Sequence, residues 1–257
     1  MDYQAISFAL ENDIATVTLN RPDRMNALNV QMRAELTHAL GEAATAARVV
    51  VITGAGEAFC SGQDLGEGRA IDLDLERVLR EEYLPMLRAI VECPVPVIAA
   101  VNGAAAGAGA NLALVCDVVI ASEDAFFQQA FTRIGLIPDA GGTWALPRQI
   151  GLAKAMGAAL FAERIPARQA EEWGLIWEVV PMRGFADHVA RRALHLAQGP
   201  TEAYKRVKEA LHASFGNSLD EQLTLEAQLQ GACGKTRDFQ EGVIAFLEKR
   251  PAKYEGR

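Results

Sequence analysis

Three glycine-rich segments carry the residues whose types and spacing could do chemistry. They are GAGEAFCSGQDL at 54–65, VNGAAAGAGANLAL at 101–114 and GLIPDAGGTWALP at 135–147. Each combines small residues, which let a ligand approach the backbone, with an apolar run. Such a set can polarise a carbonyl with backbone N–H groups and move a proton with a single acid. The candidate proton carrier is Asp139.

The segment 101–114 places Gly103, Gly107 and Gly109 at a turn from a predicted strand into a predicted helix. The first N–H groups of a helix have no partner within it, so the N–H of Ala108 is a candidate donor to an oxyanion. A dinucleotide-binding fingerprint is excluded, because Leu112 stands where that motif needs glycine. Tight packing of the helix on the strand is the alternative reason for the small residues, and this segment alone leaves both open.

The segment 54–65 follows a predicted buried strand and continues as a loop. The N–H of Gln63 is the second candidate oxyanion donor. A nucleophilic role for Cys60 or Ser61 is disfavoured, because a G-x-S-x-G motif and a suitably placed histidine are both missing. Asp64 is typical of a loop or helix cap.

Asp139 lies between Pro138 and Ala140, with Ile137 before it. Apolar neighbours disfavour the charged form of a carboxyl, which raises its pKa and makes it a stronger base. The alternative is that Asp139 caps a helix predicted to begin near Gly141. Spacing alone does not decide between a base and a cap.

Composition excludes several classes of protein. The 257 residues are 50% hydrophobic, which suits one large domain or a domain with a helical appendage. The net charge of −8 argues against a dedicated nucleic-acid-binding protein. The four cysteines form no CxxC pair and the four histidines have no ligand spacing, so no metal site or disulfide framework is indicated. Neither a signal peptide nor a membrane span is indicated, and we expect a cytoplasmic location.

Hydrophobic periodicity predicts an α/β architecture. It predicts a hairpin turning at 11–13, strands at 49–53, 97–101, 117–121 and 176–180, and helices at 30–47, 72–91, 108–115, 142–161 and 166–174. From about residue 185 the chain is predicted to be helical, with breaks at 199–200, 216–217 and 234–235. This last part forms no sheet, so its apolar faces must pack on the core or on another subunit.

Taken together, the segments resemble the crotonase superfamily, also called the enoyl-CoA hydratase/isomerase family. The resemblance runs from NRPDRMNALN to FLEKR and covers essentially the whole chain. It implies a crotonase-like spiral of ββα units over residues 1–198, which holds an acyl-CoA site, and a helical trimerisation region over residues 199–257. It further implies a homotrimer or a homohexamer, that is, a dimer of trimers. The partner is an acyl-CoA thioester, whose coenzyme A is part of the substrate, and no separate cofactor is expected.

The family holds the thioester oxygen with two backbone N–H groups, which motif matching gives to Gln63 and Ala108. The two catalytic glutamates of the family's hydratases fall on Asn111 and Phe131, so both are missing here. An aspartate at position 139 is similar to the isomerase and dehalogenase branches. FCSGQDL, NGAAAGAGANLAL, GLIPDAGGTWALPR, EEWGLIWEVV and EGVIAFLEKR look most like the 1,2-epoxyphenylacetyl-CoA isomerase subfamily of phenylacetate catabolism. That subfamily converts the epoxide to the oxepin form and shifts a C=C bond between β,γ and α,β positions.

The resemblance also implies substrate contacts. Arg24 is expected near the pyrophosphate and Lys249, from a neighbouring subunit, near the nucleotide end, while Phe131 and Trp144 are expected to form the acyl pocket. The full implied set is Arg24, Ala27, Ser61, Gly62, Asp64, Leu65, Gly107, Asn111, Phe131, Trp144 and Lys249. The alternatives are a Δ3,Δ2-enoyl-CoA isomerase or a hydratase of fatty-acid oxidation, and a non-catalytic acyl-CoA- or RNA-binding member of the fold. The acidic composition and Asp139 argue against the last.

Overall fold

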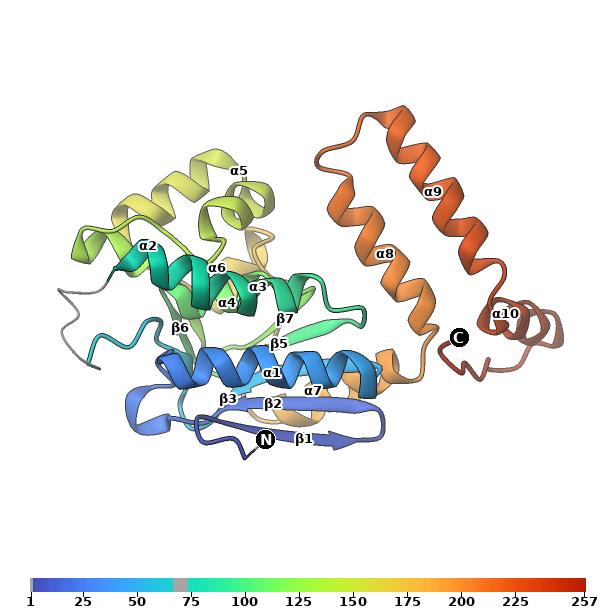
Figure 1. The fold of residues 1–257 in the computed structure, drawn as a ribbon, viewed down its shortest axis with the longest axis horizontal. Coiled ribbons are helices and arrows are strands. Elements are labelled where there is room, and N and C mark those ends of the chain that lie inside the picture. The colour runs from blue at the N-terminus through green and yellow to red at the C-terminus, as the bar shows by residue number, and fades with distance from the viewer. Residues whose placement is uncertain (1, 67–73) are drawn as a thin grey trace.

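A hairpin opens the chain in the computed structural model, which describes residues 2–66 and 74–257. Strands β1 (Ile6–Glu11) and β2 (Ile14–Leu19) pair antiparallel around a turn in which Asn12 and Asp13 adopt left-handed backbone, at φ 52° and 63°. Asparagine and aspartate tolerate this conformation better than other side chains. Helix α1 (Val30–Ala46) then crosses one face of the sheet (Figure 1). The predicted hairpin and helix are both confirmed.

The hairpin is one edge of a six-stranded sheet with the order β1-β2-β3-β5-β7-β10. Its remaining strands are β3 (Val49–Gly54), β5 (Val97–Val101), β7 (Val118–Ser122) and β10 (Glu178–Val180), and all pairings from β2 onward are parallel. Alternate residues of β3 face opposite cores: Ile52 packs with α1, whereas Val51 packs against α7 (Phe185–Ala197). Burial on both faces explains the continuous apolar runs of these strands.

A second sheet of four short strands was not predicted. Its strands are β4 (Ala58–Cys60), β6 (Ala104–Ala106), β8 (Phe126–Gln128) and β9 (Arg164–Pro166), in that order. Each has three residues, and β6 is a run of alanines with no β-branched side chain, so strand propensity gave no signal.

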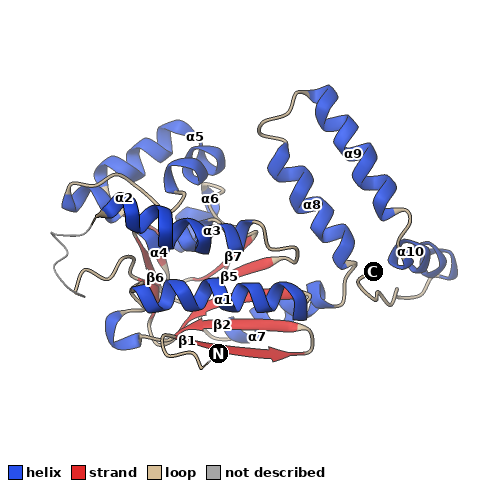
Figure 2. Cartoon of the chain, viewed as in Figure 1, coloured by secondary structure: helices blue, strands red, loops and turns tan. Residues whose placement is uncertain are grey.

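The two sheets define a repeated unit. The chain passes from β3 to β4, from β5 to β6 and from β7 to β8, each time from the large sheet to the small one, and helical structure follows each pair. Successive units pair in parallel within both sheets, so they stack into the expected spiral of ββα units (Figure 2). The predicted α/β fold class is confirmed.

The helical parts of the spiral contain two irregularities. The described part of the helix predicted at 72–91 consists of α2 (Leu75–Val78), a π-helical turn (Leu79–Tyr83) and α3 (Leu84–Val91), whereas residues 72–73 lie outside the described residues. Helix α5 (Gly142–Phe161) bends at Gly151, whose φ is 74°. The other helices of the spiral are α4 (Ala108–Leu114) and α6 (Ala167–Glu172).

A helical arm stands apart from the spiral in Figure 1 and comprises α8 (Thr201–Ala213), α9 (Leu219–Cys233) and α10 (Arg237–Glu248). We call residues 199–257 the C-terminal arm; the predicted boundary falls in the turn between α7 and α8. The arm is tied to the spiral where Lys208 Nζ lies 2.6 Å from Asp117 Oδ2 and where Arg48 Nε donates to Thr201 Oγ1 at 2.9 Å. None of the helices within the described ranges is both long and apolar enough to cross a membrane.

Candidate active site

The loop that carries Gln63 lies beside the loop after β2. Leu28 N donates to Gly62 O at 2.7 Å, and Asp64 N donates to Leu28 O at 3.1 Å. These two bonds make an isolated parallel bridge between Leu28 and Gln63. In such a bridge the middle residue directs its own N–H away from its partner. The bridge therefore turns the Gln63 N–H away from Leu28.

Several residues predicted from the two loops do come together. Ser61 N donates to Met25 O at 3.0 Å, and Ser61 Oγ donates to Arg24 O at 3.3 Å. Ala27 lies one residue before the bridge and is buried. Arg24 is exposed, so its side chain is accessible to a ligand that occupies this side of the loop.

Asp64 is held within the protein. Its Oδ2 lies 2.8 Å from Arg21 Nη1, and its Oδ1 accepts a hydrogen bond from Gly66 N at 2.8 Å. Burial by itself would raise the pKa of Asp64, but the bonds from Gly66 and Arg21 hold it below its ordinary value. The carboxylate therefore fixes the loop, and a contact of Asp64 or of the exposed Leu65 with substrate stays a prediction.

Gly62 brings the loop against the first turn of α4. Its φ is 99°, and a Cβ placed there would lie 2.9 Å from Ala106 O and 3.4 Å from Ala108 N. Gly107 caps α4 at φ 53° and donates its N–H to Gln128 O, which leaves Ala108 N as the first donor of the helix. Among the described residues, neither Gln63 N nor Ala108 N has an acceptor. The geometry therefore fits both explanations of the small residues: they let the Gln63 loop pack tightly on α4, and they leave two N–H donors for an oxyanion.

Asp139 follows the 3₁₀ turn at Ala130–Ile134 and precedes α5. Within the described ranges, its buried Oδ1 has no hydrogen-bond partner. Burial raises the pKa of Asp139 to about 6, because the charged form loses its hydration. The N-cap alternative fails, since Gly141 is the N-cap of α5 and no side chain caps it. The Asp139 side chain is therefore free for chemistry.

Asn111 holds the backbone of Asp139 in place. Its Nδ2 donates to Asp139 O at 2.7 Å, and its Oδ1 accepts from Gln129 Nε2 at 2.8 Å. The amide also packs on Gly142, where a Cβ would lie 2.3 Å from Asn111 Nδ2. Sequence reasoning left the role of Asn111 open and missed Gln129. The structure gives Asn111 a positioning contact with Asp139.

An apolar pocket of about 370 Å³ opens at Asp139. Its lining residues are Leu75, Leu79, Tyr83, Leu84 and Leu87 from the helical segment 75–91, and Leu136, Ile137, Pro138, Asp139, Ala140 and Gly141. Asp139 is the only carboxylate among them. A larger pocket of about 690 Å³ lies between the large sheet and α7 and includes neither Asp139 nor the two N–H donors, so we place no chemistry there.

The pocket walls differ from the prediction that Phe131 and Trp144 form them. Phe131 lies beside Gly107, with its Cζ 3.9 Å from the place of a Cβ there. Arg148 Cζ lies 4.5 Å from the centroid of the Trp144 ring, and Trp144 is half exposed. Neither residue lines the pocket. The leucines were missed because a stripe of leucines on a helix reads equally well as ordinary core.

Lys249 is not brought to this pocket within one chain. It ends α10 in left-handed backbone, at φ 54°, and is exposed. Helix α10 lies at the opposite end of the molecule from α2 and α5 in Figure 1. A contact between Lys249 and substrate would need a second copy of the chain and stays a prediction.

Comparison with known proteins shows which enzyme family the chain is similar to. The family model for enoyl-CoA hydratase/isomerase matches residues 9–257. A probable enoyl-CoA hydratase of Rhodobacter capsulatus is 61% identical over the full length of both chains. The 1,2-epoxyphenylacetyl-CoA isomerase of Escherichia coli is 45% identical over 96% of this chain and 97% of its own.

Solved structures give the same result. The crystal structure of an enoyl-CoA hydratase from Bacillus anthracis superposes with a TM-score of 0.92 at 35% identity, and the match covers 99% of this chain and 100% of the other. The family model matches nearly the whole chain, and the fold is the expected spiral. These two findings are sufficient to assign the family. The chain belongs to the enoyl-CoA hydratase/isomerase family, the crotonase superfamily of enzymes that act on CoA thioesters.

Proposed function

We propose that the chain is an acyl-CoA isomerase, most of all a 1,2-epoxyphenylacetyl-CoA isomerase that converts the epoxide to the oxepin form. We propose that it also shifts a C=C bond of enoyl-CoA thioesters between the β,γ and α,β positions. One observation carries the proposal. Among the described residues, Asp139 is the only carboxylate that lines the apolar pocket, and its Oδ1 has no hydrogen-bond partner there. A reaction that moves one proton between two carbons needs one such group.

In the proposed mechanism of the double-bond shift, written for a 3-enoyl-CoA, the thioester oxygen accepts hydrogen bonds from Gln63 N and Ala108 N. The Asp139 carboxylate removes a proton from the α-carbon, and the electron pair moves into a dienolate whose charge rests on the thioester oxygen. The new carboxylic acid then gives its proton to the γ-carbon, which leaves the double bond at α,β. Loss of one such donor typically lowers the rate by ~10²–10³.

The environment of Asp139 suits both proton transfers. Because burial raises its pKa to about 6, the carboxylate is charged at neutral pH and yet holds a proton more firmly than an exposed aspartate. With an acyl chain in the pocket, the surrounding leucines shield the Asp139 carboxyl from water, which keeps the proton on the carboxyl between the two steps. This path uses the coenzyme A of the substrate and no separate cofactor.

A hydratase is the second candidate, because the relative that is 61% identical is named a probable enoyl-CoA hydratase. Hydration needs a group that activates water in addition to one that delivers a proton. The Asn111 amide does not titrate, and both of its polar atoms already have partners. We therefore rank the isomerase first, and the 45% identical 1,2-epoxyphenylacetyl-CoA isomerase supports the choice of substrate.

Incubation with three thioesters distinguishes the two functions. A 3-enoyl-CoA should become the conjugated 2-enoyl-CoA, followed by ultraviolet absorbance, and 1,2-epoxyphenylacetyl-CoA should become an isomer of equal mass on chromatography. Crotonyl-CoA should gain water only slowly, followed as a mass increase of one water molecule. Hydration of crotonyl-CoA at or above the isomerisation rate would overturn the proposal in favour of the hydratase.

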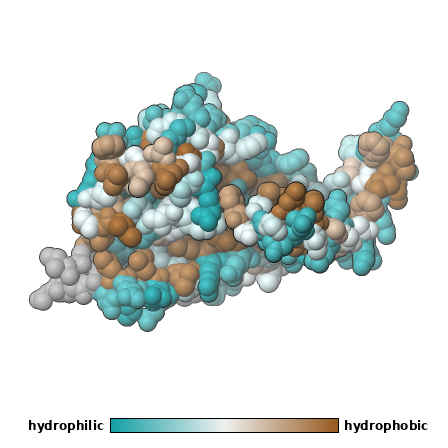
Figure 3. Space-filling model, turned by 90° about the horizontal axis from the view of Figure 1, so that it is seen from above, coloured by the Kyte–Doolittle hydropathy of each residue, from teal (hydrophilic) through white to brown (hydrophobic). Residues whose placement is uncertain are grey.

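We also propose that the arm mediates a trimer or a dimer of trimers. Apolar side chains remain uncovered on the arm, among them Leu219 at 74%, Phe246 at 83% and Leu247 at 73% exposure. Brown apolar surface gathers along the arm in Figure 3. Exposure on this scale is unusual for a soluble monomer, which supports burial against another subunit.

A further inference from the structure

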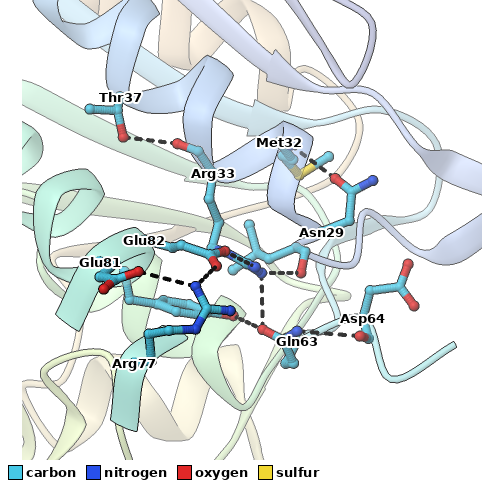
Figure 4. A network of polar contacts seen from close by, with 11 residues as sticks. Asn29, Met32, Arg33, Thr37, Gln63, Asp64, Arg77, Glu81 and Glu82 are labelled. Atoms are coloured by element: carbon cyan, nitrogen blue, oxygen red, sulfur yellow. Dashed lines mark hydrogen bonds and ion pairs between the residues drawn. The ribbon is translucent and has the colours of Figure 1, made fainter. Parts of the chain in front are cut away.

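A buried arginine stands next to the Gln63 loop. Arg33, on α1, is 2% exposed, and its Nε and Nη2 both donate to Glu82 Oε2 (Figure 4). Its Nη1 donates to Leu28 O at 2.8 Å and to Gln63 Oε1 at 3.0 Å. Leu28 and Gln63 are the two partners of the bridge that directs the Gln63 N–H. One rigid guanidinium therefore contacts both sides of that bridge.

Tyr83 completes the hold on the Gln63 side chain. Its hydroxyl donates to Gln63 Oε1 at 2.6 Å, and its ring lies 4.9 Å from Arg33 Cζ. Gln63 Oε1 thus accepts two hydrogen bonds, which is the usual capacity of a carbonyl oxygen. Gln63 Nε2 donates to Asp64 O at 3.3 Å, within the same loop. Both Oε1 and Nε2 of Gln63 are therefore held, so the backbone of Gln63 has little freedom to rotate.

The π-helical turn explains how two adjacent residues reach this cluster. Glu82 and Tyr83 are the last two residues of that turn, Leu79–Tyr83. An inserted residue shifts the helix register, and π-helical turns occur frequently at functional sites. Here Glu82 reaches Arg33 while Tyr83 reaches Gln63, and both Leu79 and Tyr83 also line the apolar pocket at Asp139. The same turn therefore contacts the apolar pocket and the residue that carries the oxyanion donor.

From this arrangement we infer that Arg33 is the positioning residue of the Gln63 N–H, acting with Glu82 and Tyr83. The inference rests on the proposed function, since it assumes that Gln63 N holds the thioester oxygen. The alternative is that Arg33 serves folding alone. Buried ion pairs add little net stability compared with apolar side chains of similar volume, so stability is a poor reason for this one.

Two variants and one control test the inference. Arg33→Lys keeps the charge opposite Glu82 but loses the fork that reaches Leu28 and Gln63. Tyr83→Phe removes a single hydroxyl and keeps the ring. Arg80→Met is the control, because Arg80 lies on the same helical segment and its partner among residues 2–66 and 74–257 is Glu76, at 2.8 Å on the exposed surface.

The readouts are kcat, KM and the infrared carbonyl band of a bound acyl-CoA labelled with ¹³C at the thioester. In Arg33→Lys, kcat should fall by about 10- to 100-fold. This fall should not exceed the loss of rate that follows when an oxyanion donor is removed outright. KM should change little, and the carbonyl band should move toward that of the free thioester. Tyr83→Phe should shift the band in the same direction by a smaller amount, and Arg80→Met should match the wild type.

The outcomes separate the inference from the proposed function. If the carbonyl band of the bound thioester differs from that of the free thioester in the wild type and keeps the same position in both variants, the role of Arg33 is refuted while the oxyanion donors stay in place. A wild-type band that equals that of free thioester overturns the oxyanion role of Gln63, and the inference with it. If circular dichroism shows that Arg33→Lys does not fold, Tyr83→Phe decides alone, and an unmoved band in that variant refutes the inference.

Discussion

Replacing Asp139 by asparagine should change the pH dependence of stability as well as activity. Burial raises the pKa of Asp139 from 3.8 to about 6. Between these values the folded protein binds a proton that the unfolded chain has released. The free energy of unfolding therefore falls as pH rises from about 4 to about 6, and the stabilisation by the protonated carboxyl is lost above that. Asparagine cannot titrate, so the variant lacks this fall.

The size of the effect follows from the shift. About two pKa units at 1.36 kcal/mol each give an upper bound of about 3 kcal/mol. Asp139 is only partly buried, so solvent screening reduces this to about 1–2 kcal/mol. Between low and neutral pH, the free energy of unfolding of Asp139→Asn should therefore rise by about 1–2 kcal/mol relative to that of the wild type. A gain in stability on replacing an active-site residue is expected, because active sites often hold groups in arrangements that cost folding free energy.

Urea unfolding at about pH 4.5 and about pH 7.5 measures the difference, because the Asp139 contribution changes over this interval. Asp124→Asn is the matched control, since Asp124 is an exposed aspartate outside the site. The control should keep the wild-type pH dependence. If the difference in the free energy of unfolding between wild type and Asp139→Asn stays constant across pH, the raised pKa of Asp139 is refuted.

The same variant tests the mechanism. The amide keeps the size of the side chain but cannot accept a proton, so isomerisation should fall by roughly 10²–10⁴ while the thioester still binds. In the wild type, kcat/KM should rise with pH and level off above about 6, where the free Asp139 becomes charged. Near wild-type turnover in Asp139→Asn would remove this residue from the mechanism.

Three further predictions concern other parts of the molecule. Asn111→Ala should lower kcat about tenfold with little change in thioester affinity, because Asp139 O loses its donor. The same variant should destabilise the fold by about 1–3 kcal/mol, since buried Gln129 Nε2 is left unpaired. Steady-state kinetics test the first effect, and thermal unfolding tests the second. Placing glutamate at both Asn111 and Phe131 should raise crotonyl-CoA hydration, measured as the mass gain of one water; unchanged hydration would mean that more than these two carboxylates is missing. Light scattering at micromolar concentration should give the mass of three or six chains, and a stable single mass of 27.7 kDa would contradict the role of the arm.

Much of the fold could be predicted because one physical rule dominates each element. The runs at 49–53 and 97–101 are buried on both faces, and the helix at 30–46 shows a regular apolar stripe. The run Ala104–Ala106 gave no such signal. It is a strand because Ala58–Cys60 and Phe126–Gln128 pair with it on either side, which is a property of the spiral and not of three alanines.

The site divides in the same way. Gln63, Ala108 and Asp139 could be predicted because glycine spacing exposes backbone donors and apolar neighbours desolvate an acid. Arg33 and Glu82 were missed, because 49 positions separate them and only the folded chain joins them. One signal did exist: Arg33 lies three and seven positions before Leu36 and Leu40 on the apolar stripe of α1. A charge on such a stripe is rarely buried without a partner.

Asp64 directly follows Gln63, and Asp139 O accepts a hydrogen bond from Asn111 on α4, the helix that begins at Ala108. The surroundings of these two aspartates decide which can carry a proton. Asp64 meets Arg21 and the Gly66 N–H, which hold its pKa below the ordinary value, so it stays charged throughout any proton transfer. Asp139 meets leucines and no donor among the described residues, and its pKa is raised to about 6. Environments that push two like groups apart in pKa give them separate tasks. The same missing hydrogen bond that makes Asp139 costly to fold also leaves its oxygen free to accept and return a proton.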